Sequence, residues 1–411
     1  MKILFLNAYF QPESIPFTYL EKDIMQAMID IGYEIEVICP VPTRGLKPDV
    51  VAAYARRRDE TLHNGKIHVR RFWAPQEGRN PIIRAFRYFW CNIMEYMLGC
   101  KYKDIDIIFA VSTPPTQGYL AGKLSKKLRC PFIYSLQDIF PDSLVHAGLT
   151  DGGSLLWRIG RALEKRTYNA ASKVVVISED FRKNLLEKEV PDKKISVIRN
   201  WADNQSVFPV EREKNRLFDE YGLDRSKFYI CYSGNIGHTQ NMDMLLNAAK
   251  SLMDVPKIGF VLVGDGAAKA DVEERIKNES IHNVTMLPFQ PYERISEVFS
   301  LGDCGLIISK PGVGNNSVPS KTWSIMSAAR PVLASFDKGY ELDRVIQEAN
   351  CGICVQAGEA GKLRDAVLKM YKNRKEYEVC GSNGRQYIME NLTREIGTSK
   401  WVNVMRKISE K

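Results

Sequence analysis

The sequence predicts an α/β protein made of two doubly wound, Rossmann-like domains. Its 411 residues are too many for one ordinary hydrophobic core and suit two domains of about 200 residues each. The composition, 45% hydrophobic and 26% charged, is typical of a globular protein. Short apolar runs, the pattern of buried parallel strands, alternate with helix-length amphipathic segments along the whole chain. This alternation predicts the fold class.

The expected strands follow one another in two sets. In the first half they are residues 2–8, 34–40, 66–72, 105–111, 131–137, 173–178 and 194–200, and in the second half 228–234, 258–264, 284–289, 304–309, 331–335 and 352–356. We therefore expect an N-terminal domain over 1–203, a C-terminal domain over 204–385, and a linker near 200–215. The helical pattern of 386–411 predicts a segment that crosses back to the N-terminal domain.

The basic residues are concentrated in the first half of the chain. Residues 1–200 carry 30 Lys and Arg against 22 Asp and Glu, whereas residues 201–411 carry 28 against 27. Such asymmetry favours an acidic partner for the N-terminal domain, either nucleic acid or an anionic membrane, with a merely well-solvated surface as the alternative. The start of the chain is a strand without a cleavage site, and no apolar run approaches the ~18 residues of a membrane span.

Nine scattered cysteines do not form the framework of a small secreted protein, and a reducing cytosol is the better expectation. Cys351 and Cys354 have the spacing of a redox motif. They lack a second pair for zinc and open an apolar strand, so we expect no chemistry there.

The loop after the first strand excludes one class of enzyme. A dinucleotide-binding domain would carry G-x-G-x-x-G here, and its absence argues against an NAD or FAD oxidoreductase. Instead Pro12, Glu13, Ser14 and Pro16 form a turn before a helix, whose first N–H groups could bind an anion. An ordinary Pro- and Ser-containing turn is the alternative.

The loop after residues 131–137 supplies a carboxylate. Ligands of open α/β sheets bind beyond the carboxyl ends of the strands, so Asp138 is a candidate base or a group that holds substrate hydroxyls. Asp142 is expected to cap the next helix, and His146 is expected to be an ordinary surface or core histidine.

Three loops of the second half point to one ligand. In the first of them Gly234 and Gly237 bring the backbone close to the ligand, and Asn235, His238 and Gln240 direct polar groups at it. In the second, Gly264 and Gly266 flank Asp265 at a strand end. In the third, Lys321 begins a helix, where the helix dipole disfavours a cation, so an anion is expected beside it. An ordinary surface lysine is the alternative.

These segments carry a family resemblance. The runs VVVISEDFRKNLL, YSGNIG, FVLVGDGAAK, NVTMLPFQPYERISEVFSLGDCGLIIS and SVPSKTWSIMSAARPVLA resemble the nucleotide-sugar glycosyltransferases of the GT-B superfold, family 4. More narrowly, the chain is similar to bacterial O-antigen and capsule transferases that add aminosugars such as N-acetylfucosamine. The resemblance, which spans residues 1 to about 400, implies two Rossmann-like domains facing a central cleft. It also implies a UDP-sugar or similar donor in the second domain, an acceptor in the first, retention of configuration, no metal and no cofactor.

The chain departs from the family pattern at several positions. Where the family has two Glu residues in the donor loop, this chain has Asn316 and Ser324, and where the family has an Arg and a Lys that bind the diphosphate, it has Asn235 and Gln240. The family's glycine pair is replaced around Ile15, Pro16 and Phe17, and its His is replaced by Gln137. The departures fit either an inactive relative or a subfamily with its own phosphate grip. Lys321 favours the second, in which the N–H groups of Ser317 and Val318 join Lys321 on the diphosphate. Asn316 and Ser324 then hydrogen-bond ribose or sugar hydroxyls.

We therefore expect a retaining glycosyltransferase that moves a sugar, an N-acetylated hexose, from a nucleoside diphosphate to a polyprenyl-diphosphate-linked saccharide. The expected place is the inner face of a bacterial plasma membrane, with no nucleic-acid partner. The leaving diphosphate would accept the acceptor proton in a front-face attack, and its stabilisation would be the largest catalytic effect. The alternatives are a non-catalytic GT-B partner and a GT-B nucleotide-sugar epimerase, which would need acids in the donor loop.

Residues 79–103 predict the membrane contact. A helix starts at Pro81, and one face of it collects Ile82, Ile83, Phe86, Phe89, Trp90, Ile93, Met94 and Met97. Basic residues lie at its flanks and edges, namely Arg79, Arg84, Arg87, Lys101 and Lys103. Aromatic density with basic flanks favours an anionic membrane surface, and a core helix packed on the sheet is the alternative.

Overall fold

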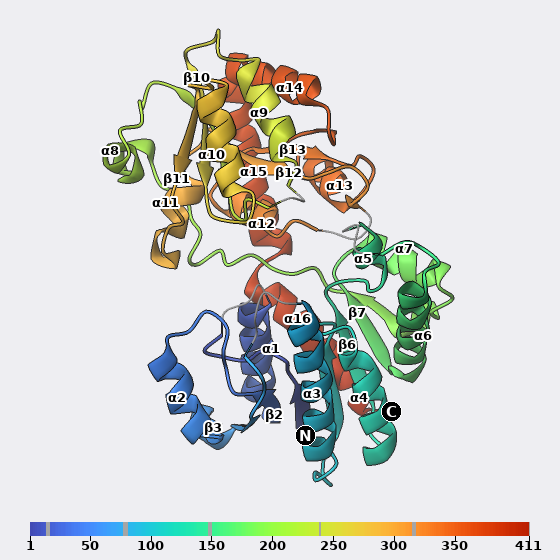
Figure 1. Ribbon diagram of the computed structural model, residues 1–411. Coiled ribbons are helices and arrows are strands. Elements are labelled where there is room, and N and C mark those ends of the chain that lie inside the picture. The colour runs from blue at the N-terminus through green and yellow to red at the C-terminus, as the bar shows by residue number, and fades with distance from the viewer. Residues whose placement is uncertain (14–16, 77–80, 147–149, 238–239, 315–317, 411) are drawn as a thin grey trace. The chain divides into compact units, whose positions relative to one another are not determined.

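The protein divides into two compact units in the computed structural model, which describes residues 1–13, 17–76, 81–146, 150–237, 240–314 and 318–410. Unit 1 is Met1–Arg199 together with Glu395–Lys411, and unit 2 is Asn200–Arg394 (Figure 1). The unit boundaries fall at 199/200 and 394/395, about four and nine residues from those expected at 203 and 385.

Unit 1 contains an eight-stranded sheet in the order β3-β4-β2-β1-β5-β6-β7-β8. Its strands are β1 (Lys2–Leu6), β2 (Glu34–Pro40), β3 (Asp59–Leu62), β4 (Ile67–Phe72), β5 (Ile107–Val111), β6 (Phe132–Leu136), β7 (Lys173–Val176) and β8 (Ile195–Val197). All seven expected strands of the first half are present. The edge strand β3, antiparallel to β4, was not predicted, because its sequence DETL has no apolar run and it is only half-buried.

The helices of unit 1 cover the sheet. They are α1 (Thr18–Asp30), α2 (Pro48–Arg56), α3 (Pro81–Gly99), α4 (Gln117–Leu128), α5 (Asp142–His146), α6 (Leu155–Ala170), α7 (Glu179–Glu187) and α16 (Arg394–Ser409), with 3-10 turns η1 (His63–Gly65) and η2 (Asp192–Lys194). The C-terminal helix α16 is part of this unit because Trp401 packs against Phe109 of β5, with 5.3 Å between ring centroids.

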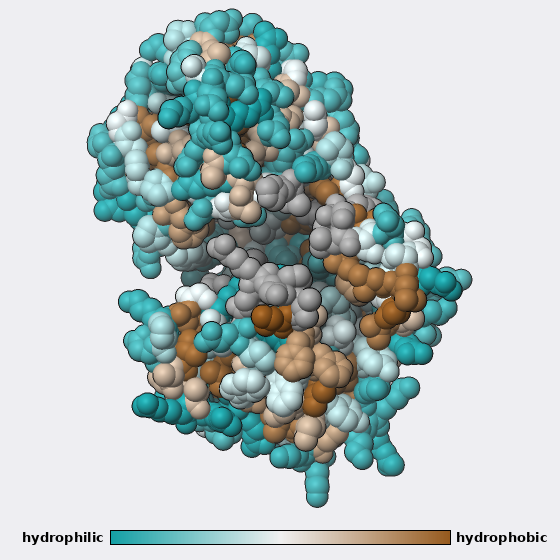
Figure 2. Space-filling model, in the orientation of Figure 1, coloured by the Kyte–Doolittle hydropathy of each residue, from teal (hydrophilic) through white to brown (hydrophobic). Residues whose placement is uncertain are grey.

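Helix α3 buries two charged side chains and exposes several apolar ones. Arg87 and Glu95 are both almost completely buried, and Glu95 accepts a 2.6 Å hydrogen bond from Gln117. Arg87 donates to the carbonyl of Pro75, so the expectation that it lies at a basic edge of the surface is wrong. Figure 2 shows hydrophobic side chains gathered on the face where α3 lies in Figure 1. Among the described residues, no helix combines the length and apolar content of a membrane span.

Unit 2 contains a six-stranded, fully parallel sheet in the order β11-β10-β9-β12-β13-β14. These are the six strands expected in the second half, namely β9 (Phe228–Ser233), β10 (Ile258–Val263), β11 (Val284–Leu287), β12 (Cys304–Ile308), β13 (Val332–Phe336) and β14 (Gly352–Gln356). The order is that of a doubly wound nucleotide-binding fold, with the switch in strand order between β9 and β12.

The helices of unit 2 are α8 (Leu217–Glu220), α9 (Met242–Lys250), α10 (Lys269–Asn278), α11 (Ile295–Phe299), α12 (Lys321–Ser327), α13 (Glu341–Glu348), α14 (Ala360–Lys372) and α15 (Arg374–Asn391), with 3-10 turns η3 (Arg212–Lys214) and η4 (Tyr292–Arg294). Residues 200–215, the expected linker, belong to this unit. The backbone N–H groups of Phe208 and Val210 donate to the hydroxyls of Ser296 and Ser300, at 3.0 and 2.9 Å.

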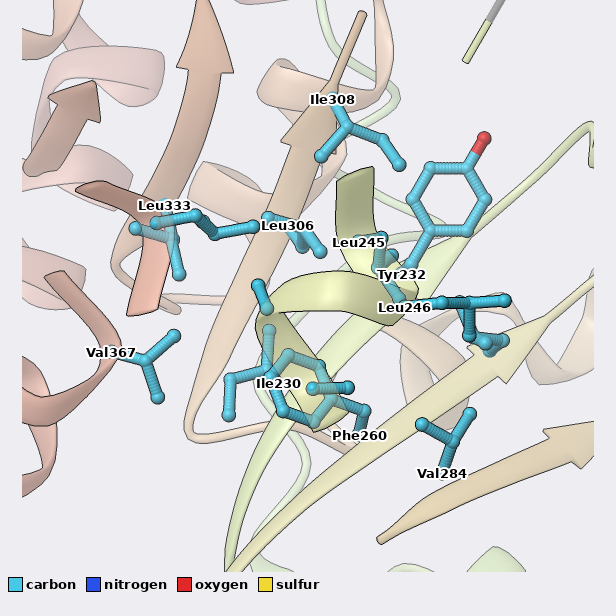
Figure 3. Close-up of a cluster of buried hydrophobic side chains, with 14 of the residues drawn as sticks. Ile230, Tyr232, Leu245, Leu246, Phe260, Val284, Leu306, Ile308, Leu333 and Val367 are labelled. Atoms are coloured by element: carbon cyan, nitrogen blue, oxygen red, sulfur yellow. The ribbon is translucent and has the colours of Figure 1, made fainter. Parts of the chain in front are cut away.

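The largest core cluster of unit 2 lies between the sheet and its helices. Ile230, Phe260 and Leu306 project from neighbouring strands toward Leu245 of α9 and Val367 of α14 (Figure 3). Each such side chain contributes ~1.5–3 kcal/mol when it leaves water, so this layer fixes the strands whose ends carry the loops described below.

Candidate functional site

Three loops of unit 2 meet at the switch point of its sheet. The segment after β9 begins at Gly234, the segment after β10 begins at Gly264, and α12 begins at Lys321 after β12. β9 and β12 are neighbours at the switch in strand order, and open α/β sheets bind ligands beyond the carboxyl ends of such strands.

The glycines of this site are required by close approach. A Cβ on Gly234 would lie 1.9 Å from the Lys321 ammonium nitrogen, and a Cβ on Gly264 would lie 1.9 Å from the Gly234 carbonyl oxygen. Both glycines also have positive φ angles, +138° and +156°, which other residues rarely adopt. The sequence expectation that these three segments come together is met in the structure.

Lys321 is held by Tyr232, a residue that the sequence analysis did not select. The Lys321 ammonium lies 3.3 Å from the Tyr232 hydroxyl oxygen and 4.8 Å from the centre of its ring. The hydroxyl donates to the carbonyl of Asn235 at 2.6 Å, so its lone pairs are available to the ammonium. Tyr232 is buried, and its position in an apolar strand made it look like a core residue.

The charge of Lys321 is exposed to little water. Burial lowers the pKa of the Lys321 ammonium to about 8. Within the described part of the chain, no carboxylate forms an ion pair with it, and the Tyr232 ring and hydroxyl are its polar neighbours. A desolvated cation without a counter-charge attracts an anion strongly.

The loop after β10 is tied to the loop after β9. Ile236 donates its N–H to the Asp265 carbonyl at 2.8 Å, and the Asp265 carboxylate accepts the N–H of Gly266 at 2.8 Å. The Asn235 amide lies within 2.6 Å of the position that a Cβ of Gly237 or of Gly266 would occupy. Asn235 and Asp265 remain exposed, so their outer atoms can meet a ligand.

The other expected donor residues lie nearby or outside the described residues. The side-chain amide oxygen of Gln240 is 2.9 Å from the Cβ position of Gly237, and Ser324 lies one turn after Lys321 on α12. Val318 is partly buried against the core cluster that contains Trp323. His238, Asn316 and Ser317 of this site, with Ser14 and Pro16 of unit 1, lie outside the described residues.

Asp337, directly after β13, is a second residue that the sequence analysis missed. It is buried, and one carboxylate oxygen accepts the N–H groups of Gly312 and Gly314, at 2.8 and 2.9 Å. It therefore fixes the start of the loop that leads to α12. A carboxylate immediately after a predicted strand was the available signal.

In unit 1, Gln137 and Asp138 follow β6 on a rigid loop. Their N–H groups both donate to the Ser112 hydroxyl after β5, at 2.9 and 3.1 Å. Asp138 is exposed, yet partial desolvation raises the pKa of its carboxyl, opposed by a hydrogen bond from Ser143. A fixed, exposed carboxylate with a raised pKa suits contact with a substrate hydroxyl.

Asp142 has a structural role that differs from the expected helix cap. It is the first residue of α5, and its carboxylate pairs with the Lys188 ammonium at 2.7 Å. Burial opposes its ionisation, but the hydrogen bonds from Lys188 and Asn184 prevail and lower its pKa. Lys188 also pairs with Glu164 at 2.7 Å, so these charges join α5, α6 and α7.

Glu13 also serves the fold. It is almost completely buried, and one carboxylate oxygen accepts the N–H groups of Thr43 and Arg44, at 2.7 and 2.8 Å. It ties the loop after β1 to the loop after β2 and does not face solvent. Burial raises the pKa of its carboxyl, an effect that the nearby backbone donors and Arg87 oppose. Phe17, partly exposed, directly precedes α1.

The cysteine pair with the spacing of a redox motif is buried. Cys351 and Cys354 are buried free thiols, and burial raises the pKa of each to about 12, far from a reactive thiolate. Over the residues that the structure describes, no three His, Cys, Asp or Glu side chains form a group that could hold a metal ion.

Comparison with known proteins finds similarity along nearly the whole chain. The model described as Glycosyltransferase Family 4 matches residues 22–206, and the model described as Glycosyl transferases group 1 matches residues 213–387. WbjE of Pseudomonas aeruginosa, named a probable glycosyltransferase, is 26% identical over 395 residues, which cover 95% of this chain and 94% of WbjE. WcaI of Escherichia coli, described as a colanic acid biosynthesis glycosyl transferase, is 24% identical over 99% of this chain and 100% of WcaI.

Solved structures share the fold. Anabaena HepE in complex with UDP and glucose has a TM-score of 0.72 and 15% identity, covering 99% of this chain and 100% of HepE. Sucrose-phosphate synthase from Thermosynechococcus elongatus has a TM-score of 0.74 and 14% identity, covering 99% of this chain and 98% of that one.

Proposed function

The chain belongs to the family 4 glycosyltransferases of GT-B fold, and we propose that it transfers a sugar from a UDP-linked donor to a lipid-linked saccharide in bacterial surface polysaccharide synthesis. The observation that carries the proposal is the Lys321 ammonium, desolvated and without a carboxylate partner among the described residues, at the switch point of a nucleotide-binding sheet.

In this proposal Lys321 binds the diphosphate of the donor. The anomeric C–O bond to the diphosphate breaks while the acceptor oxygen bonds to the anomeric carbon from the same face, and the acceptor proton passes to the leaving diphosphate. Configuration is retained. Negative charge grows on the diphosphate, and an ammonium already fixed by Tyr232 stabilises it without reorganisation. The Lys321 ammonium offsets part of this charge, and we propose that the reaction needs no metal.

Two neighbouring residues support donor binding. Asn235 and Asp265 are exposed beside Gly234 and Gly264, so their polar atoms could contact the nucleotide. Ser324, one turn along α12 from Lys321, is placed to meet a ribose or sugar hydroxyl as a neutral partner.

Unit 1 supplies the acceptor site in this proposal. Asp138 would orient the acceptor hydroxyl, because its loop is pinned by Ser112 and its carboxylate is exposed. The name of WcaI refers to colanic acid biosynthesis, and the HepE structure is a complex with UDP and glucose. Both support a UDP-linked donor and a role in polysaccharide synthesis. The N-acetylated hexose follows from the family resemblance.

The acceptor's lipid would bring the enzyme to the inner face of the plasma membrane. Helix α3 exposes Ile83, Phe86, Phe89, Ile93 and Met97 along one side, and Phe89 is 65% exposed. Exposed Lys101 and Lys103 follow the helix, and each basic residue contributes ~1 kcal/mol of attraction to anionic lipid. We propose that this side of α3 contacts the bilayer.

A thermal-shift comparison of UDP, GDP, dTDP and ADP tests the donor site. A ligand at about 100 times its Kd stabilises a protein by ~2.7 kcal/mol, a rise of several degrees for a domain of this size. We expect such a rise with UDP and little with the others. The matched control is Lys321→Met, which should show no UDP-dependent rise. If no nucleotide raises the melting temperature of the wild type, the donor site is refuted.

A further inference from the structure

Helix α6 exposes a second apolar surface in unit 1. Leu155, Leu156 and Ile159, in its first two turns, are exposed, and Leu155 is 74% exposed. The opposite side of α6 is buried through Gly160, Glu164, Thr167 and Tyr168. The helix therefore already has a packed side, and the three apolar side chains add nothing to the core.

The helix between the two apolar surfaces is basic. Helix α4 packs against both α3 and α6, so the three helices lie in the order α3, α4, α6 (Figure 1). The exposed residues of α4 are all lysines, Lys123, Lys126 and Lys127. On α6, exposed Arg158 lies between the apolar residues, and Lys165 and Arg166 are exposed further along the helix.

The two carboxylates of these three helices are both buried. Glu95 of α3 is bonded to Gln117, and Glu164 of α6 is paired with Lys188, so neither offsets the exposed lysines. Figure 2 shows hydrophobic side chains over α3 and again over the region of α6 on one face of the molecule. Apolar side chains beside uncompensated cations match the chemistry of an anionic bilayer surface, in which hydrocarbon lies below negative headgroups.

The α6 surface also adjoins the candidate acceptor loop. A Cβ on Gly160 would lie 2.8 Å from Pro141 and 2.9 Å from Phe140, so α6 packs directly on the turn that follows Asp138. A membrane contact at α6 would thus act one turn away from the residue proposed to hold the acceptor.

We propose that the first two turns of α6 form a second membrane contact, so that unit 1 docks on an anionic bilayer through α3 and α6 with the lysines of α4 between them. This proposal rests on the proposed function, since the bilayer is the place of a lipid-linked acceptor. Docking through α6 holds the Asp138 loop at the level of the lipid headgroups, where a lipid diphosphate and its first sugars lie.

Co-sedimentation of the full chain with phosphatidylcholine vesicles, containing increasing phosphatidylglycerol, tests the proposal. Leu155→Ser plus Ile159→Ser should lower the partition coefficient about tenfold. Neutralising Lys123, Lys126 and Lys127 to Gln should lower it about fivefold per lysine, the ratio that corresponds to ~1 kcal/mol, and only when the vesicles are anionic. The matched control, Phe289→Ser plus Val379→Ser, removes equally exposed apolar residues from unit 2 and should bind like the wild type.

Hydrogen exchange locates the contact. Vesicles should protect amides at the beginning of α6 in the wild type but not in the Leu155→Ser, Ile159→Ser variant. Equal pelleting of that variant and the wild type, without protection of α6, overturns the proposal. It is also overturned if light scattering shows a dimer that the same variant dissociates, because a second copy then covers this surface.

The UDP thermal shift separates this proposal from the donor site. The α6 variant (Leu155→Ser, Ile159→Ser) and the α4 lysine variant should keep the UDP-dependent rise in melting temperature of the wild type. That rise also shows that the variants are folded. If the Leu155→Ser, Ile159→Ser variant pellets like the wild type without protection of α6, while both keep the UDP response, only the membrane contact is refuted. Vesicle binding through α6 without any UDP response refutes only the donor site.

Discussion

Replacing Lys321 by methionine should stabilise the free protein. The pKa of the ammonium falls from 10.5 to about 8 on folding, which corresponds to about 3 kcal/mol of unfavourable burial at neutral pH. Methionine occupies the same space beside Gly234 without a charge. The loss of the cation–π contact with the Tyr232 ring offsets the gain in stability by ~1 kcal/mol. We therefore expect the free energy of unfolding to rise by about 1–2 kcal/mol in urea titrations at pH 7.

The same substitution should damage donor binding and turnover. If the Lys321 ammonium stabilises the leaving diphosphate, its loss should slow sugar transfer by ~100-fold, the effect of removing one stabilising group of a transition state. Stability and activity should thus change in opposite directions, as expected when a group is retained for function at the expense of stability.

The pH dependence follows from the same pKa. Between pH 8 and 10.5 the unfolded chain keeps a proton that the folded protein has lost at Lys321, so this group makes the wild type more stable as the pH rises. UDP affinity should fall over the same range, because the diphosphate binds the ammonium form. Calorimetric titration with UDP between pH 7 and 9.5 should show this fall in the wild type and not in Lys321→Met.

Unchanged transfer kinetics in Lys321→Met would remove the proposed role of the ammonium. A large loss of stability in the same variant would show that Lys321 supports the fold, and the argument from its burial would then be wrong.

Three further substitutions test the surrounding geometry. Gly234→Ala should lower the unfolding free energy by ~1–3 kcal/mol and weaken UDP binding, since its Cβ would lie 1.9 Å from the Lys321 nitrogen; Gly222→Ala, where the space is open, should leave UDP binding unchanged in calorimetry. Asp138→Asn should reduce turnover without altering UDP affinity, whereas a lower melting temperature with normal turnover would indicate a structural role. Asp337→Ala leaves two loop N–H groups without their acceptor and should weaken UDP binding several-fold, while a normal UDP titration would separate this loop from the donor site.

The strands could be predicted because buried parallel strands are continuous apolar runs. Residues 228–234 and 258–264, for example, become the fully or mostly buried strands β9 and β10. The edge strand β3 could not be predicted, because its half-exposed polar residues have no apolar pattern. Only its pairing with β4 identifies it as a strand. The amphipathic pattern of α3 predicted an apolar side correctly, but only the packing shows that Arg87 lies inside.

The site was predictable where the backbone demands a particular residue. Gly234 and Gly264 stand at strand ends, and Lys321 stands where a helix begins, so each has a local signal. Tyr232 has no such signal, and the signal of Asp337, a carboxylate after a strand, does not show what it binds. Tyr232 reads as an apolar strand residue, and Asp337 acts through backbone groups more than twenty residues away. The turn position of Glu13 was predicted, but its role in binding the neighbouring loop through Thr43 is shown only by the packing.

The buried lysine also decides between an active enzyme and a non-catalytic scaffold. The family's acidic and basic positions hold neutral residues here, which by itself suits a protein that has lost donor chemistry. A scaffold, however, gains nothing from an ammonium whose burial is unfavourable by about 3 kcal/mol, and many single substitutions at Lys321 would relieve that cost. Unfavourable groups held in place by their surroundings cluster at functional sites. The Gly234 and Gly264 contacts and the Tyr232 hydroxyl hold Lys321 in this way, and the arrangement is useful only if an anion binds there.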